Sequence, residues 1–181
     1  ARAPPCRRTP PRLKRTTTRS ALQPTTMNAL TYATLLFLHV AGAAFWVGGM
    51  AAMHFAVRPA AVATLAPPQR LPFMAAALGR FFRGVDIALA VLWASGLAMF
   101  MVLGGFAGTH WRVHAMFTGA LVMTGVYVWL RARGLPALRR AVTASQWPEA
   151  GERLGGIRRL VALNLALGTA VFAVALLGRA A

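Results

Sequence analysis

The sequence predicts an all-α integral membrane protein, a four-helix bundle with both termini on the outer (periplasmic) side of the membrane. Two observations predict this fold. Of the 181 residues, 57% are hydrophobic and only 13% are charged, which leaves too little polar surface to cover the core of a soluble enzyme. The apolar residues also gather in four long runs with few charges, and each run is long enough for a helix that crosses a bilayer.

The first predicted span lies near residues 30–57. The run from Leu30 to Val57 contains no Asp, Glu, Lys or Arg. It exceeds the ~20 residues that a membrane helix needs and the ~7–15 apolar residues of a signal peptide. A helix that stays in the membrane is therefore expected here.

Residues 1–26 form a basic tail that is rich in arginine, proline and threonine and has no acidic residue. Three interpretations fit: a disordered arm that binds anionic lipid, an Arg-rich transit peptide, or translated sequence upstream of a true start at Met27. We favour the third, because the Arg, Ala, Gly and Pro bias indicates a GC-rich gene. The tail is thus predicted to be disordered or absent from the mature protein, whose transmembrane domain covers residues 27–181.

Three further spans are predicted near residues 84–107, 112–131 and 159–178, each around a run with almost no charge. In lipid, backbone polar groups must be satisfied within the segment, so each span is a helix. The alternative is a soluble bundle of fully buried helices. It is disfavoured because residues 27–181 offer no amphipathic shell to surround four such helices.

The connections between the spans assign the sides of the membrane. The first and third connections carry most of the arginines that follow the tail, whereas the second has only Arg112. Positive residues in short loops stay cytoplasmic, which predicts a multi-pass protein of the bacterial inner membrane. In the first connection, Pro72 is expected to break the helix, and Arg83 is expected to pair with Asp86 three residues later.

Four histidines lie in or beside the predicted spans: His39, His54, His110 and His114. Ionisable groups are costly in a membrane, so a functional role is the first hypothesis; a histidine that hydrogen-bonds between helices is the alternative. Spans one and three both enter from the outer side. His39, His110 and His114 are therefore expected to converge on one metal site in the outer half, while His54 lies at the cytoplasmic end of span one.

One face of span one combines imidazole and thioether groups. At ~100° per residue, His39, Trp46, Met50, Met53 and His54 fall within one stripe. Both ligand types suit copper, and thioethers suit Cu(I) especially. The stripe predicts a copper path across the bilayer, with core packing as the alternative.

Several polar or small residues are predicted to serve packing. Gly48 and Gly49 beside Trp46 would admit a close helix, and Gly168 follows Asn164 at the four-residue spacing typical of helix contacts in membranes. Asn164 needs a hydrogen-bond partner, either a histidine or a backbone carbonyl.

Other chemistries lack support. The sequence has no cysteine after Cys6, no carboxylate deep in a span and no glycine-rich phosphate loop. Thiolate metal sites, acidic proton relays and nucleotide enzymes are therefore not indicated. No nucleic-acid partner is expected despite the net charge of +17, because the apolar runs dominate the chain.

The run Leu38–Met50, in which Trp46-Val47-Gly48-Gly49 begins seven residues after His39, resembles the first-span signature of the copper-resistance D (CopD) family. The resemblance covers about Leu30 to Arg179 and implies an inner-membrane protein of copper uptake or resistance. Further stretches resemble bacterial members at residues 57–61, 80–82, 104–107, 113–116 and 157–165. Such members tend to show His-Val-His before the methionine of span three, where this chain has Arg112, Val113 and His114.

A second, weaker resemblance is to HemJ-type four-span proteins, which are linked to protoporphyrinogen oxidation and place a lysine in span three. This chain has no lysine after Lys14. The shared architecture implies a b-type haem as an alternative cofactor, with His39 and His114 as axial ligands.

The leading functional prediction is copper binding, extended to copper transport, through His39 and His114, with further ligands from His110, Met50, Met53 and His54. The alternatives are a haem b redox protein and a structural subunit without a cofactor. The expected partners are the lipid bilayer and either a periplasmic copper-binding protein or a respiratory-chain component.

Overall fold

The structure, a computed structural model, describes residues 28–102, 104–105 and 109–178. Among these residues every regular element is helical. Four continuous helical stretches are long and apolar enough to cross a membrane: Ala29–Thr64, Pro67–Val102, Trp111–Thr143 and Trp147–Leu177. The predicted all-α, four-span fold is confirmed, whereas the tail over residues 1–26 lies outside the described residues.

Two of the four stretches contain a π-helical turn. Helix α1 (Ala29–Ala52) continues through a π turn at Met53–Val57 into α2 (Arg58–Thr64). In the same way, α5 (Trp111–Trp129) continues through a π turn at Leu130–Gly134 into α6 (Leu135–Thr143). The other two stretches are the single helices α3 (Pro67–Val102) and α7 (Trp147–Leu177).

Local sequence sets where these helices begin. The side chain of Asn28 accepts a hydrogen bond of 2.7 Å from the backbone N–H of Thr31 and so caps α1. Helix α3 begins at Pro67, where a missing N–H costs nothing because the first turn has no acceptor for it. The prediction that Pro72 breaks the helix is wrong, since Pro72 lies inside α3. Its ring removes one hydrogen bond close to the helix start, and the rest of the helix continues.

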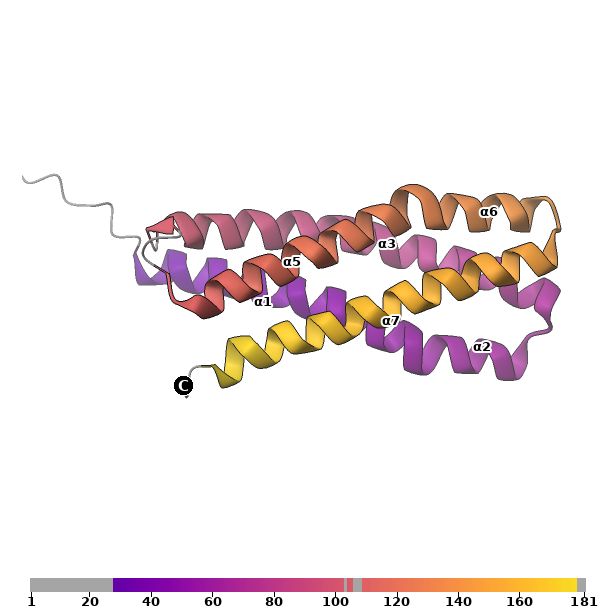
Figure 1. The fold of residues 1–181 in the computed structure, drawn as a ribbon, viewed down its shortest axis with the longest axis horizontal. Coiled ribbons are helices and arrows are strands. Elements are labelled where there is room, and N and C mark those ends of the chain that lie inside the picture. Colours follow the sequence, from indigo (N-terminus) through magenta and orange to yellow (C-terminus); the bar gives the residue numbers. More distant parts are fainter. Residues whose placement is uncertain (1–27, 103, 106–108, 179–181) are drawn as a thin grey trace, which may run out of the picture.

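The four stretches run up and down along a common axis (Figure 1). Helix α1 lies mainly along α3, α5 lies along α7, and α6 packs against both α3 and α7. The start of α1, the end of α3, the start of α5 and the end of α7 lie at one end of the bundle, here called the terminal end. The connections at residues 65–66 and 144–146 lie at the opposite end, here called the arginine-rich end because the flanking segments hold most of the arginines.

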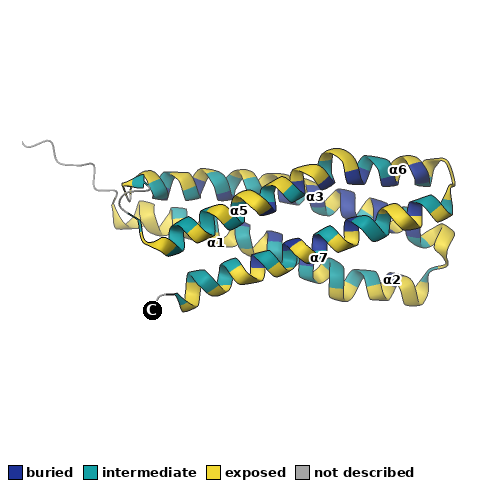
Figure 2. Cartoon of the chain, in the orientation of Figure 1, coloured by how far each residue is buried: buried dark blue, intermediate teal, exposed yellow. Residues whose placement is uncertain are grey.

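Buried side chains concentrate toward the arginine-rich end (Figure 2). The largest side chains with under 2% exposure include Phe82, Val85, Leu130, Leu135 and Leu138. Large apolar side chains also cover the outside of the bundle along its whole length. An apolar exterior is what a bundle surrounded by hydrocarbon needs.

Candidate metal site

His39 is held against α3 by a directed hydrogen bond. Its Nδ1 lies 3.1 Å from the carbonyl oxygen of Leu92 and 3.4 Å from the Oγ of Ser95. The carbonyl can only accept, so Nδ1 is the donor in the first contact. Ser95 donates its own proton to the carbonyl oxygen of Val91 at 2.6 Å. In the neutral ring, Nε2 therefore keeps its lone pair for another partner.

Two glycines admit this contact between α1 and α3. A Cβ at Gly96 would lie 2.8 Å from the Cε1 of His39, and a Cβ at Gly42 would lie 3.0 Å from the carbonyl oxygen of Ala88. Neither glycine was expected from the sequence to matter. Ser95 and Gly96 interrupt an otherwise apolar run of α3. This pair of one polar and one small residue is the sequence feature from which the contact with the His39 ring could have been predicted.

His110 has a local role at the start of α5. Its Nδ1 accepts from the Nε of Arg112 at 3.2 Å and faces the backbone N–H of the same residue at 3.5 Å. The ring thereby caps the helix. These contacts occupy the lone pair that a metal ion would need, so His110 is poorly placed as a ligand.

The predicted convergence of three histidines is not found. Within residues 28–102, 104–105 and 109–178, no three His, Cys, Asp or Glu side chains lie together as a metal site. His39 lies level with Leu92 of α3. Phe117, one turn after His114, contacts both Trp93 and Phe100, at ring-centroid distances of 5.6 Å and 5.9 Å. His114 therefore lies closer to the terminal end than His39 does, and its Nε2 is 3.5 Å from the Oγ1 of Thr109.

The remaining stripe residues of α1 face the interior. Trp46 and Met50 are 3% and 2% exposed, and the ring of Trp46 meets that of Tyr127 edge-on at 6.0 Å between centroids. Met53 is half-buried against the same core. The thioether groups thus belong to a packed core, to which they contribute dispersion contacts. A metal ion could reach their sulfur atoms only from inside the bundle.

The residues predicted to pack have different surroundings. A Cβ at Gly49 would clash with the ring of Phe81, and one at Gly168 would lie 2.7 Å from Val47. Gly48 is exposed and a Cβ there would meet nothing within 4 Å, so it makes no close helix contact among the described residues of this chain.

Asn164 joins α7 to α5 in the middle of the bundle. The residue is 1% exposed, and its Nδ2 donates to the carbonyl oxygen of Met123 at 3.1 Å. Of the two partners considered for this amide, a histidine and a backbone carbonyl, the structure places the carbonyl here. Its Oδ1 has no hydrogen-bond partner among the described residues.

The matched part of the chain decides its family. Residues 75–177 match the family model of copper resistance protein D. The chain belongs to this family. The match includes Leu92, Ser95 and Gly96, which seat the imidazole, but leaves out α1 and His39 itself. No curated protein and no solved structure matches the chain.

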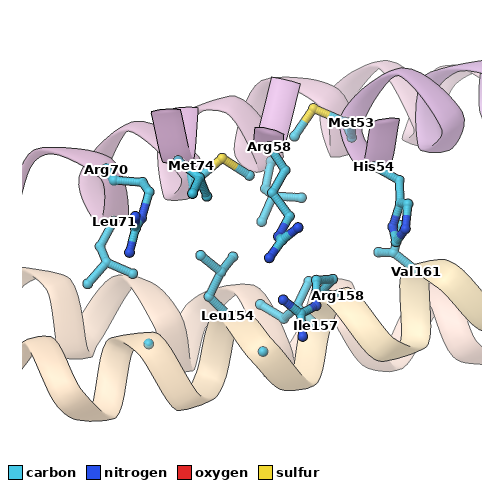
Figure 3. A pocket seen from close by; sticks show the side chains of 14 residues that line it. Met53, His54, Arg58, Arg70, Leu71, Met74, Leu154, Ile157, Arg158 and Val161 are labelled. Atoms are coloured by element: carbon cyan, nitrogen blue, oxygen red, sulfur yellow. The ribbon is translucent and has the colours of Figure 1, made fainter. Parts of the chain in front are cut away.

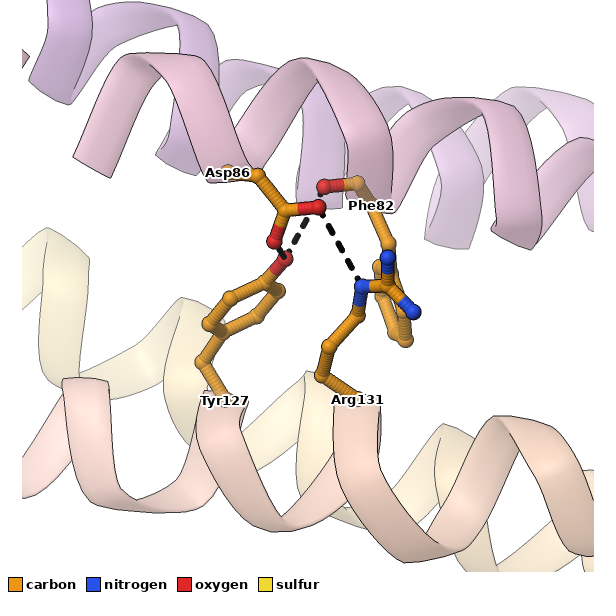
Figure 4. Close-up of polar contacts among 4 residues, drawn as sticks. All are labelled: Phe82, Asp86, Tyr127 and Arg131. Carbon is orange, nitrogen blue, oxygen red and sulfur yellow. Dashed lines mark hydrogen bonds and ion pairs between the residues drawn. The ribbon is translucent and has the colours of Figure 1, made fainter. Parts of the chain in front are cut away.

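A polar cluster that the sequence pattern did not predict joins α3 to α5 and to the π turn after α5 in this CopD-family protein (Figure 4). The hydroxyl of Tyr127 hydrogen-bonds the carboxylate of Asp86 and lies 2.9 Å from the carbonyl oxygen of Phe82. The Nε of Arg131 donates to the other carboxylate oxygen at 3.2 Å. The predicted pairing with Arg83 is wrong, because the carboxylate turns away from its own helix toward α5.

The remaining predicted ligands of the CopD-family protein, Met53 and His54, line a different cavity. It has a volume of about 180 Å³ and lies toward the arginine-rich end, where Arg58, Arg70 and Arg158 also line it (Figure 3). Three guanidinium groups oppose the binding of a cation. Met53 and His54 are therefore poorly placed as metal ligands.

Proposed function

We propose that this CopD-family protein binds copper, as Cu(I), at His39 in the bacterial inner membrane, with both termini on the periplasmic side. The orientation follows from the arginines, which gather at the end that the positive-inside rule assigns to the cytoplasm. The terminal end, toward which His39 lies, then faces the periplasm. A periplasmic copper-binding protein is the proposed supplier of the ion.

The hydrogen bond from His39 to Leu92 carries this proposal. Metal-binding histidines almost always donate their other ring N–H to a carbonyl, a carboxylate or water, which fixes the tautomer and the ring orientation. The contact of 3.1 Å between Nδ1 and the carbonyl oxygen supplies that arrangement. The ring is half-buried, so Nε2 is presented in surroundings with little competing water.

The second ligand is proposed to be His114, the imidazole on α5 toward the same end of the bundle. Imidazole is a suitable ligand for copper. Onward passage would follow the face of α1 that carries Met50, whose thioether suits Cu(I). His110, Met53 and His54 are left out of this site for the reasons of geometry and charge given above.

The test is a Cu(I) titration of the full chain in mild detergent, in competition with a chromophoric chelator. His39→Ala should weaken binding by about tenfold or more, because removing even a supporting partner of a metal ligand costs ~10–100-fold. His54→Ala is the matched control and should bind like the unmodified chain. Equal affinity in all three proteins would overturn the assignment of His39.

The visible absorption spectrum separates copper from haem. His39 would also suit an axial haem ligand, because the same hydrogen bond orients it. A Soret band that is lost in both His39→Ala and His114→Ala would establish the haem alternative. The absence of both the band and bound copper would favour a structural subunit.

A further inference from the structure

The cavity at the arginine-rich end has an apolar wall and an open side. Its volume is about 180 Å³, and residues of α2, α3 and α7 enclose it together with the π turn after α1. Gly151 and Gly155 of α7 line it, and a Cβ at either would meet nothing within 4 Å. The apolar wall comes from α3 and α7: Leu71, Met74, Leu78, Leu154, Ile157 and Val161.

Three arginines bring positive charge into this space. Arg58, Arg70 and Arg158 line the cavity, and Figure 3 shows their guanidinium groups between the two layers of helices. Within the described part of the chain, the ion pairs are Arg131 with Asp86 and Arg153 with Glu149. The three cavity arginines thus have no carboxylate partner there, and none of the described lining residues is acidic.

The π turn helps to assemble the cavity. The backbone N–H of Arg58 bonds to the carbonyl oxygen of Met53, five residues earlier, which widens the turn relative to an α-helix. His54 and Arg58, four residues apart along this segment, both line the cavity. Such turns recur at functional sites, and this one adds the imidazole of His54 to the three arginines of the cavity.

The cavity lies at the level where lipid headgroups are expected. Arg58 is the first charged residue after the uncharged run Leu30–Val57, and Arg158 and Arg159 directly precede the uncharged run Leu160–Gly178. The boundary between apolar and charged sequence marks the edge of the hydrocarbon layer. Both chain segments therefore place their arginines beside the phosphates of the adjoining leaflet.

We propose that this cavity binds the phosphate headgroup of an anionic phospholipid. Guanidinium groups match phosphate oxygens in geometry and charge, and basic pockets between membrane helices are suited to such headgroups. The apolar wall takes the glycerol and the first acyl carbons, which favours a lipid over a free anion. The site is separate from the copper proposal and does not depend on it.

Native mass spectrometry of the full chain, with added phosphatidylglycerol or phosphatidylcholine, tests the proposal. One phosphatidylglycerol per chain should be retained, and phosphatidylcholine should not. The triple variant Arg58→Gln, Arg70→Gln, Arg158→Gln should weaken retention by about tenfold to a hundredfold, given three headgroup contacts. The matched control replaces three arginines of the same end that do not line the cavity: Arg133→Gln, Arg140→Gln, Arg159→Gln.

Two further measurements keep the proposal falsifiable. Gly155→Leu fills the cavity and leaves every charge in place, so it should also release the lipid while circular dichroism shows unchanged helicity. Equal losses in the cavity triple and its control would assign the effect to general surface charge and overturn the proposal. Inorganic phosphate provides a second test. If millimolar phosphate displaced phosphatidylglycerol and by itself bound the chain as tightly as the lipid does, the cavity would be a site for free anions, and the proposal would be overturned.

Discussion

Fully buried side chains gather in the half of the bundle toward the arginine-rich end, here called the packed half, and are sparser in the half toward the terminal end, here called the open half. Leu135 and Leu138 of α6 are 1% and 0% exposed. At the other end, Leu30, Phe37 and Met101 are 76%, 69% and 76% exposed. Membrane helices gain little from burying apolar side chains away from lipid. The difference in side-chain burial between the two halves therefore reflects how closely the helices approach one another. The hydropathy of the side chains does not explain it.

Helix α6 accounts for much of the contrast. It packs on both α3 and α7, and its buried residues Leu135, Leu138 and Ala141 recur every three positions, which places them along one face. Arg139 and Arg140 are exposed. The packed half contributes most of the buried core. In the open half, His39 contacts α3 beside Gly96, which leaves room for its ring.

The largest expected effect is a loss of stability in the packed half. Leu138→Ala should lower the free energy of unfolding by about 2–5 kcal/mol, because the side chain is fully buried and its loss leaves a cavity. Leu36→Ala, at a residue that is 38% exposed near the terminal end, should cost less than about 1 kcal/mol. Unfolding by sodium dodecyl sulfate in mixed micelles, followed by circular dichroism, measures both. Equal losses would show that the two halves are equally well packed.

The next prediction concerns function in the open half. Gly96→Ala should push the His39 ring from its seat, because the added Cβ would lie 2.8 Å from Cε1. We expect Cu(I) affinity to fall by about 10–100-fold, the range for disturbing the support of a metal ligand. Helicity should stay the same, since alanine favours the helix by ~1 kcal/mol over glycine.

Gly125→Ala is the control for this variant, because a Cβ there would meet nothing within 4 Å. Its copper affinity should match that of the unmodified chain. If Gly96→Ala also kept full affinity, the seat of His39 against α3 would have no part in copper binding, and the open half would lose its proposed role.

The outline of the open half is predictable from the sequence, whereas its side-chain contacts are not. Four apolar runs suffice to predict four spans, because length and lack of charge are properties of each segment alone. His39 could be singled out in the same way, as an ionisable group in a span. Its contact with Leu92 could not, since the contact depends on how α1 and α3 rotate about their axes and slide along each other.

The same limit explains the wrong predictions. His39, His110 and His114 share a side of the predicted membrane, but a site of three histidines also needs a free nitrogen on each ring, and the ring of His110 is held by Arg112 at the start of α5. Asp86 has Arg83 three residues away along its own helix, yet its partners Tyr127 and Arg131 come from another helix, one turn apart. Asp86 is a lone carboxylate beside a predicted span, and Tyr127 and Arg131 lie four residues apart at the end of another span. This pattern is one from which the cluster could have been inferred.

The smallest of the three expected effects tests whether polar contacts or packing distinguish the two halves. The ring of Tyr127 meets Trp46 and Phe82 edge-on, at 6.0 Å and 5.5 Å between centroids, while its hydroxyl bonds Phe82 and Asp86. Tyr127→Phe keeps the ring and removes the hydroxyl, so the same unfolding titration should show a loss of about 1–2 kcal/mol. Tyr32→Phe, at a residue that is 39% exposed, should change nothing measurable. A loss at Tyr127 as large as that of Leu138→Ala would mean that the hydroxyl and the Asp86 carboxylate, rather than the buried leucines of α6, hold the packed half together.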